Sequence, residues 1–227
     1  QVPQSQTIYL SYPGDSFLEL YGNMIYQIGL PMLEDYIWRF LEISNEIDDL
    51  KQKVDTGEVL FPEIIEIGKR KLFDLVNYND FATALLHIVL SDTRFVAWKY
   101  ICGESVLHDQ RKELDIVSVI DNDEKALRAF LSLKILLNFV NKTRLFLLID
   151  EMESIETLHV FKKQKMLNSL RRVMDLNPTG LCMIMACTPE AWNGIISDYH
   201  AFSERIFRNV ILTPLNEEML RQLIIDY

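Results

Sequence analysis

Two consecutive acids, Asp150 and Glu151, stand directly after a run of apolar residues from Leu145 to Ile149. A carboxylate in such a position can bind a hard cation such as Mg²⁺, because that ion prefers oxygen ligands. A second carboxylate beside it can accept a proton from water and so activate that water as a nucleophile. The pair is therefore a candidate for metal-assisted activation of a water molecule.

The apolar run before the acids is the element that must position them. An unbroken apolar run is typical of a strand that is buried on both faces of a parallel sheet. Open sheets of this kind bind ligands in the crevice outside the carboxyl ends of their strands, where Asp150 and Glu151 are expected to lie. The alternative is a core strand that ends in two solvated acids without chemistry. The run and the Asp-Glu pair alone do not decide between these interpretations.

The composition is that of an ordinary globular protein. Of 227 residues, 49% are hydrophobic and 25% are charged, with 8 Gly and 7 Pro, so nothing indicates disorder. No apolar run approaches the roughly 18 residues that span a bilayer, and no basic-then-apolar leader opens the chain. We therefore expect no membrane partner and a location in the cytoplasm.

The formal net charge of −10 argues against nucleic-acid binding over the whole surface, because affinity for DNA rests mainly on neutralised phosphates. The basic stretch from Lys162 to Arg172 is either a solvated helix face or a local contact with DNA or another subunit. The three cysteines, Cys102, Cys182 and Cys187, show the spacing of neither a disulfide framework nor a metal knuckle. We expect them to be small buried side chains.

The chain opens on a strand and a helix. Residues 7–11 are predicted to form the strand, and Asp15 or Ser16 is expected to cap a helix that runs to about Gly29. From about residue 32 to residue 114 the periodicity is helical, with no strong strand signal. We therefore predict a large helical insertion over residues 31–120.

A second α/β portion begins near Asp121. A helix with a continuous apolar stripe leads to the strand of the acid pair, and a basic helix over residues 161–175 follows that strand. The wholly apolar segment from Leu181 to Cys187 predicts a neighbouring strand. Strands and helices that alternate in this way predict an α/β fold with a parallel sheet.

Further candidate residues follow that neighbouring strand. Thr188 stands at its end, ahead of a short helix. Arg205 and Arg208 come next, just before residues 210–212, which we predict to be a further short strand, the third of this second α/β portion. Asn216 is expected to cap the last helix.

The order of these parts resembles the core of AAA+ ATPases, which are P-loop NTPases. A Walker B strand ends in Asp150 and Glu151, a sensor 1 position falls at Thr188, and an arginine-finger region precedes the start of a lid helix. Within this class, the segments from Leu147 to Glu153 and from Ala186 to Trp192 are most similar to the ATP-binding proteins of BREX-type phage-defence systems. The resemblance is good over about residues 95–227, extends to residues 7–30 and is weak between them.

This resemblance implies an ATPase that binds ATP with Mg²⁺. It also implies a homo-oligomer that assembles on DNA or on partner proteins of a defence system. In such a protein Asp150 holds the metal, Glu151 is the catalytic base, and Thr188 senses the γ-phosphate through its hydroxyl group. Without chemistry, Thr188 simply ends a strand.

The resemblance also gives the two arginines a role. An arginine just before the last core strand reaches the phosphate of a neighbouring subunit in this family, and Arg205 fits that position better than Arg208. Arg208 is then a second candidate for binding the nucleotide. The alternative for Arg205 is a surface salt bridge with Glu204 or Glu217.

One departure from the family pattern concerns the phosphate-binding loop. The chain contains no G-x-x-x-x-G-K-[ST] motif, and the Gly68-Lys69 pair has no glycine five residues before it. Because the backbone amides of that loop cradle the phosphates, we expect this chain alone to be inactive. The chain opens on what resembles the second core strand of the family, so we expect the first strand and the P-loop in a longer polypeptide. A degenerate ATPase without the loop is the competing interpretation.

These expectations divide the chain into four parts. Residues 1–30 hold the second strand and helix of an ATPase core, residues 31–120 the helical insertion, residues 121–215 the Walker B, sensor 1 and arginine-finger elements, and residues 216–227 the start of a lid helix. Three functions fit the patterns: a BREX-type ATPase module, an initiator-like or transposition-regulator ATPase, and a non-catalytic helical interaction protein in which the acid pair is coincidental.

Overall fold

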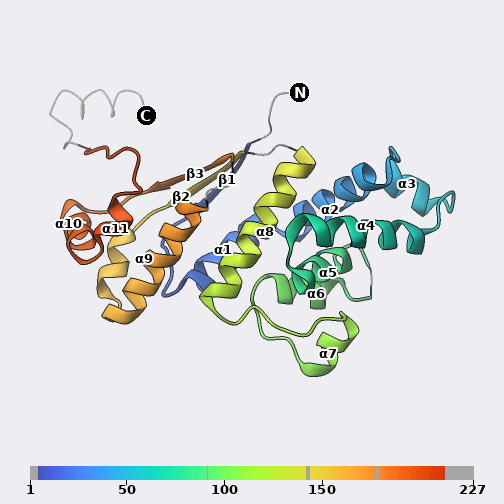
Figure 1. The fold of residues 1–227 in the computed structure, drawn as a ribbon, viewed down its shortest axis with the longest axis horizontal. Helices are drawn as coiled ribbons and strands as arrows, with labels where there is room; N and C mark the ends of the chain where they lie inside the picture. The colour runs from blue at the N-terminus through green and yellow to red at the C-terminus, as the bar shows by residue number, and fades with distance from the viewer. Residues whose placement is uncertain (1–4, 91, 142–143, 177–178, 213–227) are drawn as a thin grey trace, which may run out of the picture.

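A three-stranded parallel sheet positions the acid pair. The computed structural model describes residues 5–90, 92–141, 144–176 and 179–212. Its strands are β1 (Ser5–Leu10), β2 (Arg144–Ile149) and β3 (Leu181–Met185), with β2 in the centre. Both strand pairs are parallel (Figure 1), which confirms the predicted α/β class and the parallel sheet.

Helices form most of the remaining described chain. Those before β2 are α1 (Phe17–Ile28), α2 (Leu30–Asn45), α3 (Leu50–Asp55), α4 (Phe61–Val76), α5 (Asn79–His87), α6 (Arg94–Ile101), α7 (His108–Glu113) and α8 (Asp123–Asn141). Those after β2 are the 3₁₀ helix η1 (Met152–Thr157), α9 (Val160–Asp175), α10 (Pro189–Asp198) and α11 (His200–Ser203). Residues 31–120, position 91 aside, contain no strand, which confirms the predicted helical character of this region.

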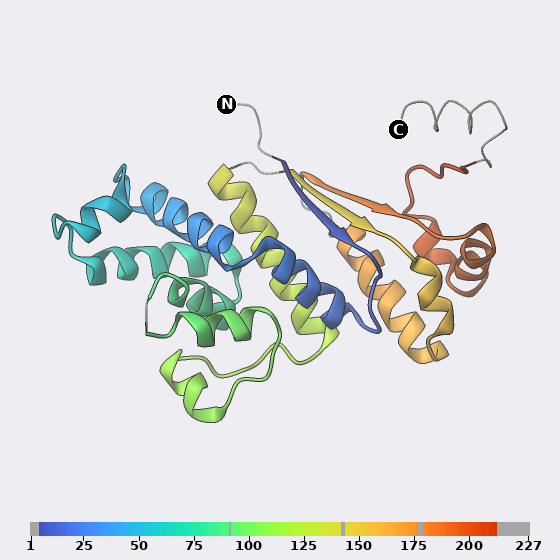
Figure 2. The same ribbon diagram turned by 180° about the vertical axis from the view of Figure 1, so that it is seen from behind.

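The helices α1, α8 and α9 cover one face of the sheet (Figures 1 and 2). Ile8 and Leu147 point to the covered face and are buried, whereas Tyr9 and Ile184 on the other face are 51% and 54% exposed. Among the described residues no helix lies over this second face (Figure 2). We call it the open face of the sheet.

The open face explains one wrong prediction. Cys182 is exposed, although the sequence led us to expect a buried side chain, because this residue of β3 lies on the open face. Cys102 is buried and Cys187 is half-buried, and all three thiols are free.

The sequence determines the ends of α1 locally. The hydroxyl oxygen of Ser16 accepts a hydrogen bond from the backbone N–H of Glu19 over 3.2 Å, so Ser16 is the cap that begins the helix. Gly29 ends it with a φ of +78°, a backbone conformation that favours glycine. Pro31 lies in the first turn of α2, where its missing N–H is not needed.

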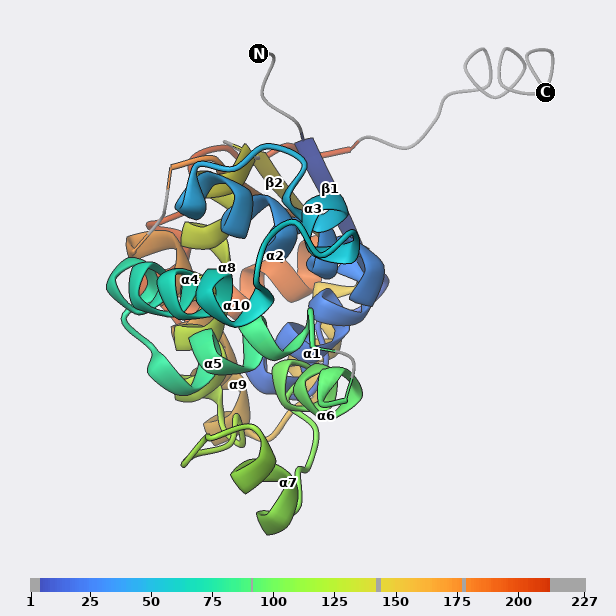
Figure 3. The same cartoon turned by 90° about the vertical axis from the view of Figure 1, so that its right-hand side faces the viewer.

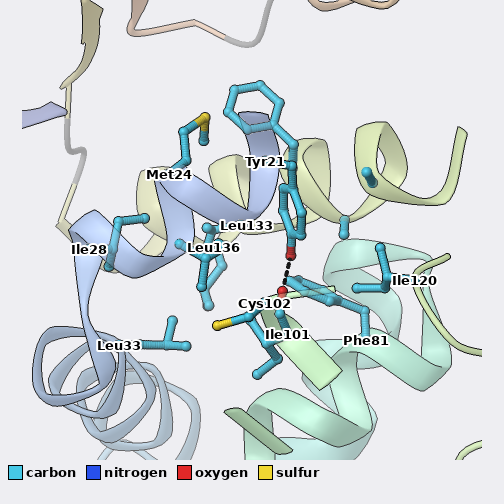
Figure 4. Packing of buried hydrophobic residues seen from close by; sticks show 14 of the residues in the cluster. Tyr21, Met24, Ile28, Leu33, Phe81, Ile101, Cys102, Ile120, Leu133 and Leu136 are labelled. Carbon is cyan, nitrogen blue, oxygen red and sulfur yellow. Dashed lines mark hydrogen bonds between the residues drawn. The ribbon is translucent and has the colours of Figure 1, made fainter. Parts of the chain in front are cut away.

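The helical region packs against α1 and α8, and α7 lies at the end of the molecule far from the sheet (Figure 3). The hydroxyl group of Tyr21 on α1 donates a hydrogen bond to the backbone carbonyl of Ile101 over 2.7 Å (Figure 4). At the neighbouring Gly22 a Cβ atom would lie 3.0 Å from the carbonyl oxygen of Cys102, so α1 approaches the end of α6 closely.

The short strand predicted for residues 210–212 is wrong. Val210, Ile211 and Leu212 are 62%, 77% and 88% exposed and lie outside any strand. A strand needs a neighbour to share its hydrogen bonds, and no described residue pairs with this segment. The helix predicted from Asn216 onward lies outside the described residues. None of the described helices is long and apolar enough to cross a lipid bilayer.

Candidate active site

The carboxyl end of β2 places Asp150 and Glu151 between the ends of the two neighbouring strands. The backbone N–H of Asp150 donates to the carbonyl oxygen of Leu10 at the end of β1, over 2.9 Å. On the other side, the N–H of Met152 donates to the carbonyl oxygen of Ala186, just after β3, over 3.0 Å. The backbone around the acid pair is therefore fixed from both neighbouring strands.

Asp150 is half-buried, and both of its carboxylate oxygens accept hydrogen bonds. The hydroxyl group of Tyr9 donates to Oδ2 over 3.0 Å, and the backbone N–H of Glu151 donates to Oδ1 over 2.9 Å. The hydrogen bond to Asp150, together with the negative charge of that carboxylate, raises the pKa of the Tyr9 phenol. Tyr9 was not predicted as a site residue, because only the pairing of β1 with β2 brings it to Asp150.

Glu151 differs from its neighbour in two ways. Its backbone has a φ of +51°, in the left-handed region that is costly for a residue other than glycine. Its side chain is exposed, and within the described residues its carboxylate has no hydrogen-bond or ion-pair partner. Glu151 therefore offers a free proton acceptor at the carboxyl edge of the sheet.

Thr188 reaches the same edge from β3. It is the N-cap of α10, and its hydroxyl oxygen accepts a hydrogen bond from the backbone N–H of Ala191 over 3.4 Å. The hydroxyl proton is not used in that contact, so the exposed Thr188 can still donate. The sheet thus brings Asp150, Glu151 and Thr188 to one edge.

The two arginines lie elsewhere on the surface. The guanidinium group of Arg205 forms an ion pair with Asp175 at the end of α9 and lies 4.0 Å from Glu204. Arg208 is exposed. Within the described residues no hydrogen bond or ion pair joins either arginine to Asp150, Glu151 or Thr188. The predicted pairing of Arg205 with Glu204 is present, but Asp175 is its closer partner, and Glu217 lies outside the described residues.

The basic helix α9 is not a uniform solvated face. Arg172 forms an ion pair with Glu124 on α8, and Lys163 is buried and forms ion pairs with two acids. Lys162 and Lys165 remain exposed. Lys163 was placed on the surface in the sequence-based prediction, because helical periodicity does not reveal which basic residues meet buried acids.

The residues at this edge fit a magnesium ion that is shared with a ligand. Mg²⁺ is commonly held by one or two carboxylates together with phosphate oxygens and water. Asp150 supplies one such carboxylate, and each of its oxygens keeps a second lone pair beside the hydrogen bond that it accepts. The described residues contain no group of three or more His, Cys, Asp or Glu side chains that could hold a metal by themselves.

Two cavities lie away from the acid pair. One of about 310 Å³ is lined in part by Gly103, Arg111 and Asp121. Another of about 250 Å³ is lined in part by Arg144 and Gly180, at the amino ends of β2 and β3. Neither is lined by Asp150 or Glu151, so the candidate site is an edge of the sheet and not one of these pockets.

Comparison with known protein families identifies a family to which the chain is similar. The model of a family described as BREX system ATP-binding protein BrxC/D matches residues 71–225. The matched range includes the acid pair, Thr188 and both arginines. No curated protein and no solved structure matches the chain.

Proposed function

The chain belongs to the family of BREX system ATP-binding proteins BrxC/D, and from this premise we propose that the carboxyl edge of its sheet is the hydrolytic part of an ATP site. The observation that carries the proposal is the contrast between two adjacent acids. Asp150 has both oxygens oriented by hydrogen bonds, whereas Glu151 has an exposed, unpaired carboxylate within the described residues. An oriented acid suits a metal ligand, and an unpaired acid suits a general base.

Each residue at the edge then has one task. ATP and Mg²⁺, when bound, supply the phosphoryl group and the cation that the chemistry requires. Asp150 would hold the metal ion with its carboxylate. Glu151 orients a water molecule and accepts its proton during attack. Thr188 would donate a hydrogen bond from its hydroxyl group to the terminal phosphate.

We propose that the phosphate cradle comes from a strand and loop outside these 227 residues. The sheet topology supports this. When each new parallel strand is added on the same side of the preceding one, the connecting helices all lie on one face of the sheet. The reason is that such crossover connections are right-handed. The order β1-β2-β3 with its helices on one face is such an arrangement. Ligands bind where the strand order reverses and helices pass to the other face, and the described strands do not reach that point.

The outer edge of β3 is where the additional strand would fit. Within the described residues β3 pairs with β2 alone, and the open face beside it is uncovered. A parallel strand at this edge would create a switch point next to the loops that carry Glu151 and Thr188. We assign the chain to the AAA+ type of P-loop core, which has these features.

Arg205 and Arg208 are proposed to act on the nucleotide of a neighbouring subunit in a homo-oligomer. Their lack of contact with the acid pair of their own chain, within the described residues, supports this role. A positive charge that arrives from another subunit can stabilise the transition state of phosphoryl transfer. Nucleotide state would then be coupled to assembly on DNA or on partner proteins of the defence system.

The test is ATP binding and hydrolysis by the full-length protein. Glu151→Gln keeps shape and hydrogen bonding but removes the base, so ATP should still bind while turnover falls by roughly two to four orders of magnitude. Asp150→Asn should weaken the Mg²⁺-dependent part of nucleotide binding. Glu113→Gln, at an exposed acid on α7, is the control. If both site variants hydrolyse ATP like the control, a non-catalytic interaction protein becomes the better interpretation.

A further inference from the structure

Lys163 on α9 is a buried cation that the proposed reaction does not use. Its side chain is only 7% exposed. Its ammonium group donates a hydrogen bond to Oε2 of Glu156 over 2.8 Å and to Oδ2 of Asp198 over 2.5 Å. Burial lowers the pKa of Lys163 and its hydrogen bonds to the two acids raise it, and the net shift is upward. Lys163 therefore stays charged at neutral pH.

The two partners of Lys163 come from the two segments that carry the candidate catalytic residues. Glu156 belongs to η1, which directly follows Glu151. Asp198 is the last residue of α10, the helix that Thr188 caps. One ammonium group thus ties the segment after the base to the helix after the phosphate sensor.

Packing around Lys163 brings the same two segments together. Met152 and Ile155 of η1 are buried, as is Ile195 of α10, and the two helices are in contact. At Gly194 a Cβ atom would lie 2.9 Å from Oε2 of Glu156, the same oxygen that accepts from Lys163. The carboxylate of Glu156 therefore lies directly against the backbone of α10.

A buried charge is costly unless it is paired, so the position of Lys163 restricts both acids. Movement of η1 alone or of α10 alone would leave the ammonium group without one of its partners. The two segments are then expected to move together or not at all.

We propose that Lys163 is a positioning residue that holds η1 and α10 as one unit, and so fixes the spacing between Glu151 and Thr188. The proposal rests on the catalytic roles proposed for those two residues. Lys163 itself touches neither the nucleotide nor the attacking water. Its effect is to keep the base and the phosphate sensor at a constant distance from each other during the reaction.

The mechanical link can be tested in the 227-residue chain by amide hydrogen exchange. Lys163→Met keeps the length of the side chain but removes the charge, and exchange should accelerate roughly tenfold or more in residues 152–157 and 189–198 together. Lys163→Arg should restore protection in both segments. Lys162→Met, at the exposed neighbouring position, is the matched control and should change neither segment. Asp198→Asn, which keeps the buried cation, serves as a second variant if Lys163→Met does not fold.

The catalytic consequence can be tested in the full-length protein. Lys163→Met should lower kcat roughly 10- to 100-fold, because small misplacements of reacting groups have effects of this size, while KM for ATP changes little. Lys163→Arg should recover much of the loss.

Two results would overturn the proposal. One is exchange that accelerates in only one segment or in neither. The other is an unchanged kcat for Lys163→Met in a protein whose Glu151→Gln variant is impaired. If Glu151→Gln itself keeps full activity, the proposed function fails, and the exchange experiment still decides whether Lys163 joins the two segments.

Discussion

The hydroxyl group of Tyr9 donates a hydrogen bond to Oδ2 of Asp150 over 3.0 Å, although 141 positions separate the two residues in the sequence. Tyr9 pairs in register with Leu148 on β2, which places it diagonally across from Asp150. The main chain makes the same connection, since the N–H of Asp150 donates to the carbonyl oxygen of Leu10. The proposed metal ligand is thus anchored to β1 through both backbone and side chain.

Tyr9→Phe should weaken Mg²⁺-dependent nucleotide binding by the full-length protein. The change removes the hydroxyl group that orients Asp150 and leaves the ring in place. Because one partly exposed hydrogen bond to a carboxylate is lost, the expected effect is about three- to tenfold in affinity. Calorimetric titration with ATP, in the presence of Mg²⁺ and again in the presence of a chelator, measures it.

Tyr26→Phe provides a closely matched control. Tyr26 is 52% exposed, against 51% for Tyr9, and its hydroxyl group also donates to a carboxylate, that of Glu104. This pair lies between α1 and the residues that follow α6, away from the acid pair. Equal losses of affinity in the two variants would show that Tyr9 has no special role at Asp150.

Arg205→Ala should suppress ATP hydrolysis only where subunits meet. Binding of ATP by a single subunit should be spared, because Arg205 makes its described contacts with Asp175 and Glu204 and not with the acid pair. Mixing Arg205→Ala with Glu151→Gln should restore part of the activity, since each variant supplies what the other lacks at one kind of interface. Steady-state hydrolysis by the mixture, compared with each variant alone, is the measurement.

Co-assembly of the two variants must be checked by size-exclusion chromatography. If they co-assemble and the mixture is no more active than either variant alone, Arg205 loses its role in trans. Arg208→Ala in the same mixing experiment would then test the second candidate.

The 227-residue chain alone should bind Mg²⁺-ATP weakly or not at all. It contains the proposed metal ligand but no loop of the G-x-x-x-x-G-K-[ST] form, and phosphate affinity depends strongly on such backbone amides. Calorimetry on this chain tests the expectation directly. Micromolar affinity would reveal a phosphate-binding loop of another form within these residues.

The buried Lys134 should make the free energy of unfolding depend on pH. This residue of α8 is fully buried, and burial lowers its pKa from 10.5 to about 8. Between these two values the unfolded chain binds more protons than the folded one, so the free energy of unfolding rises with pH in this window. The cost of burying the charge is fully present below pH 8. Lys134→Met removes that cost.

The stabilisation of Lys134→Met relative to the original chain should therefore be largest below pH 8 and shrink toward pH 10.5. At about 1.4 kcal/mol for each pKa unit, the change across the window is on the order of 3 kcal/mol. Urea unfolding at a series of pH values measures it, with the exposed Lys112→Met as the control. A pH-independent difference between Lys134→Met and the original chain would contradict the depressed pKa.

The central strand could be predicted because an unbroken apolar run indicates a buried strand without further information. The apolar run up to Ile149 is predicted to be a buried strand and forms the centre of the sheet. Asp150, Glu151 and Thr188 became candidate site residues because they follow such runs directly. Residues 210–212 have the same apolar character but form no strand, since strand formation also depends on a neighbouring edge that the described chain does not offer.

The residues that support the site could not be predicted. Tyr9 contacts Asp150 only through strand pairing, and Lys163 meets Glu156 and Asp198 only after three separate segments have packed together. Local periodicity contains no information about such distant contacts. It also does not reveal that one face of the sheet is open, which is why Cys182 was expected to be buried.

The helices α1 and α8 pack against both the sheet and the helical region, and this limits how the protein can be shortened. Apolar side chains of both helices pack among residues of the helical region such as Phe81 and Ile101 (Figure 4). They are Tyr21, Met24 and Ile28 on α1 and Leu133 and Leu136 on α8. Deleting residues 31–120 would expose this apolar surface to water, although no strand would be removed. A protein shortened in this way should precipitate or require detergent to stay in solution. The helical region therefore keeps the apolar surfaces of α1 and α8 away from water.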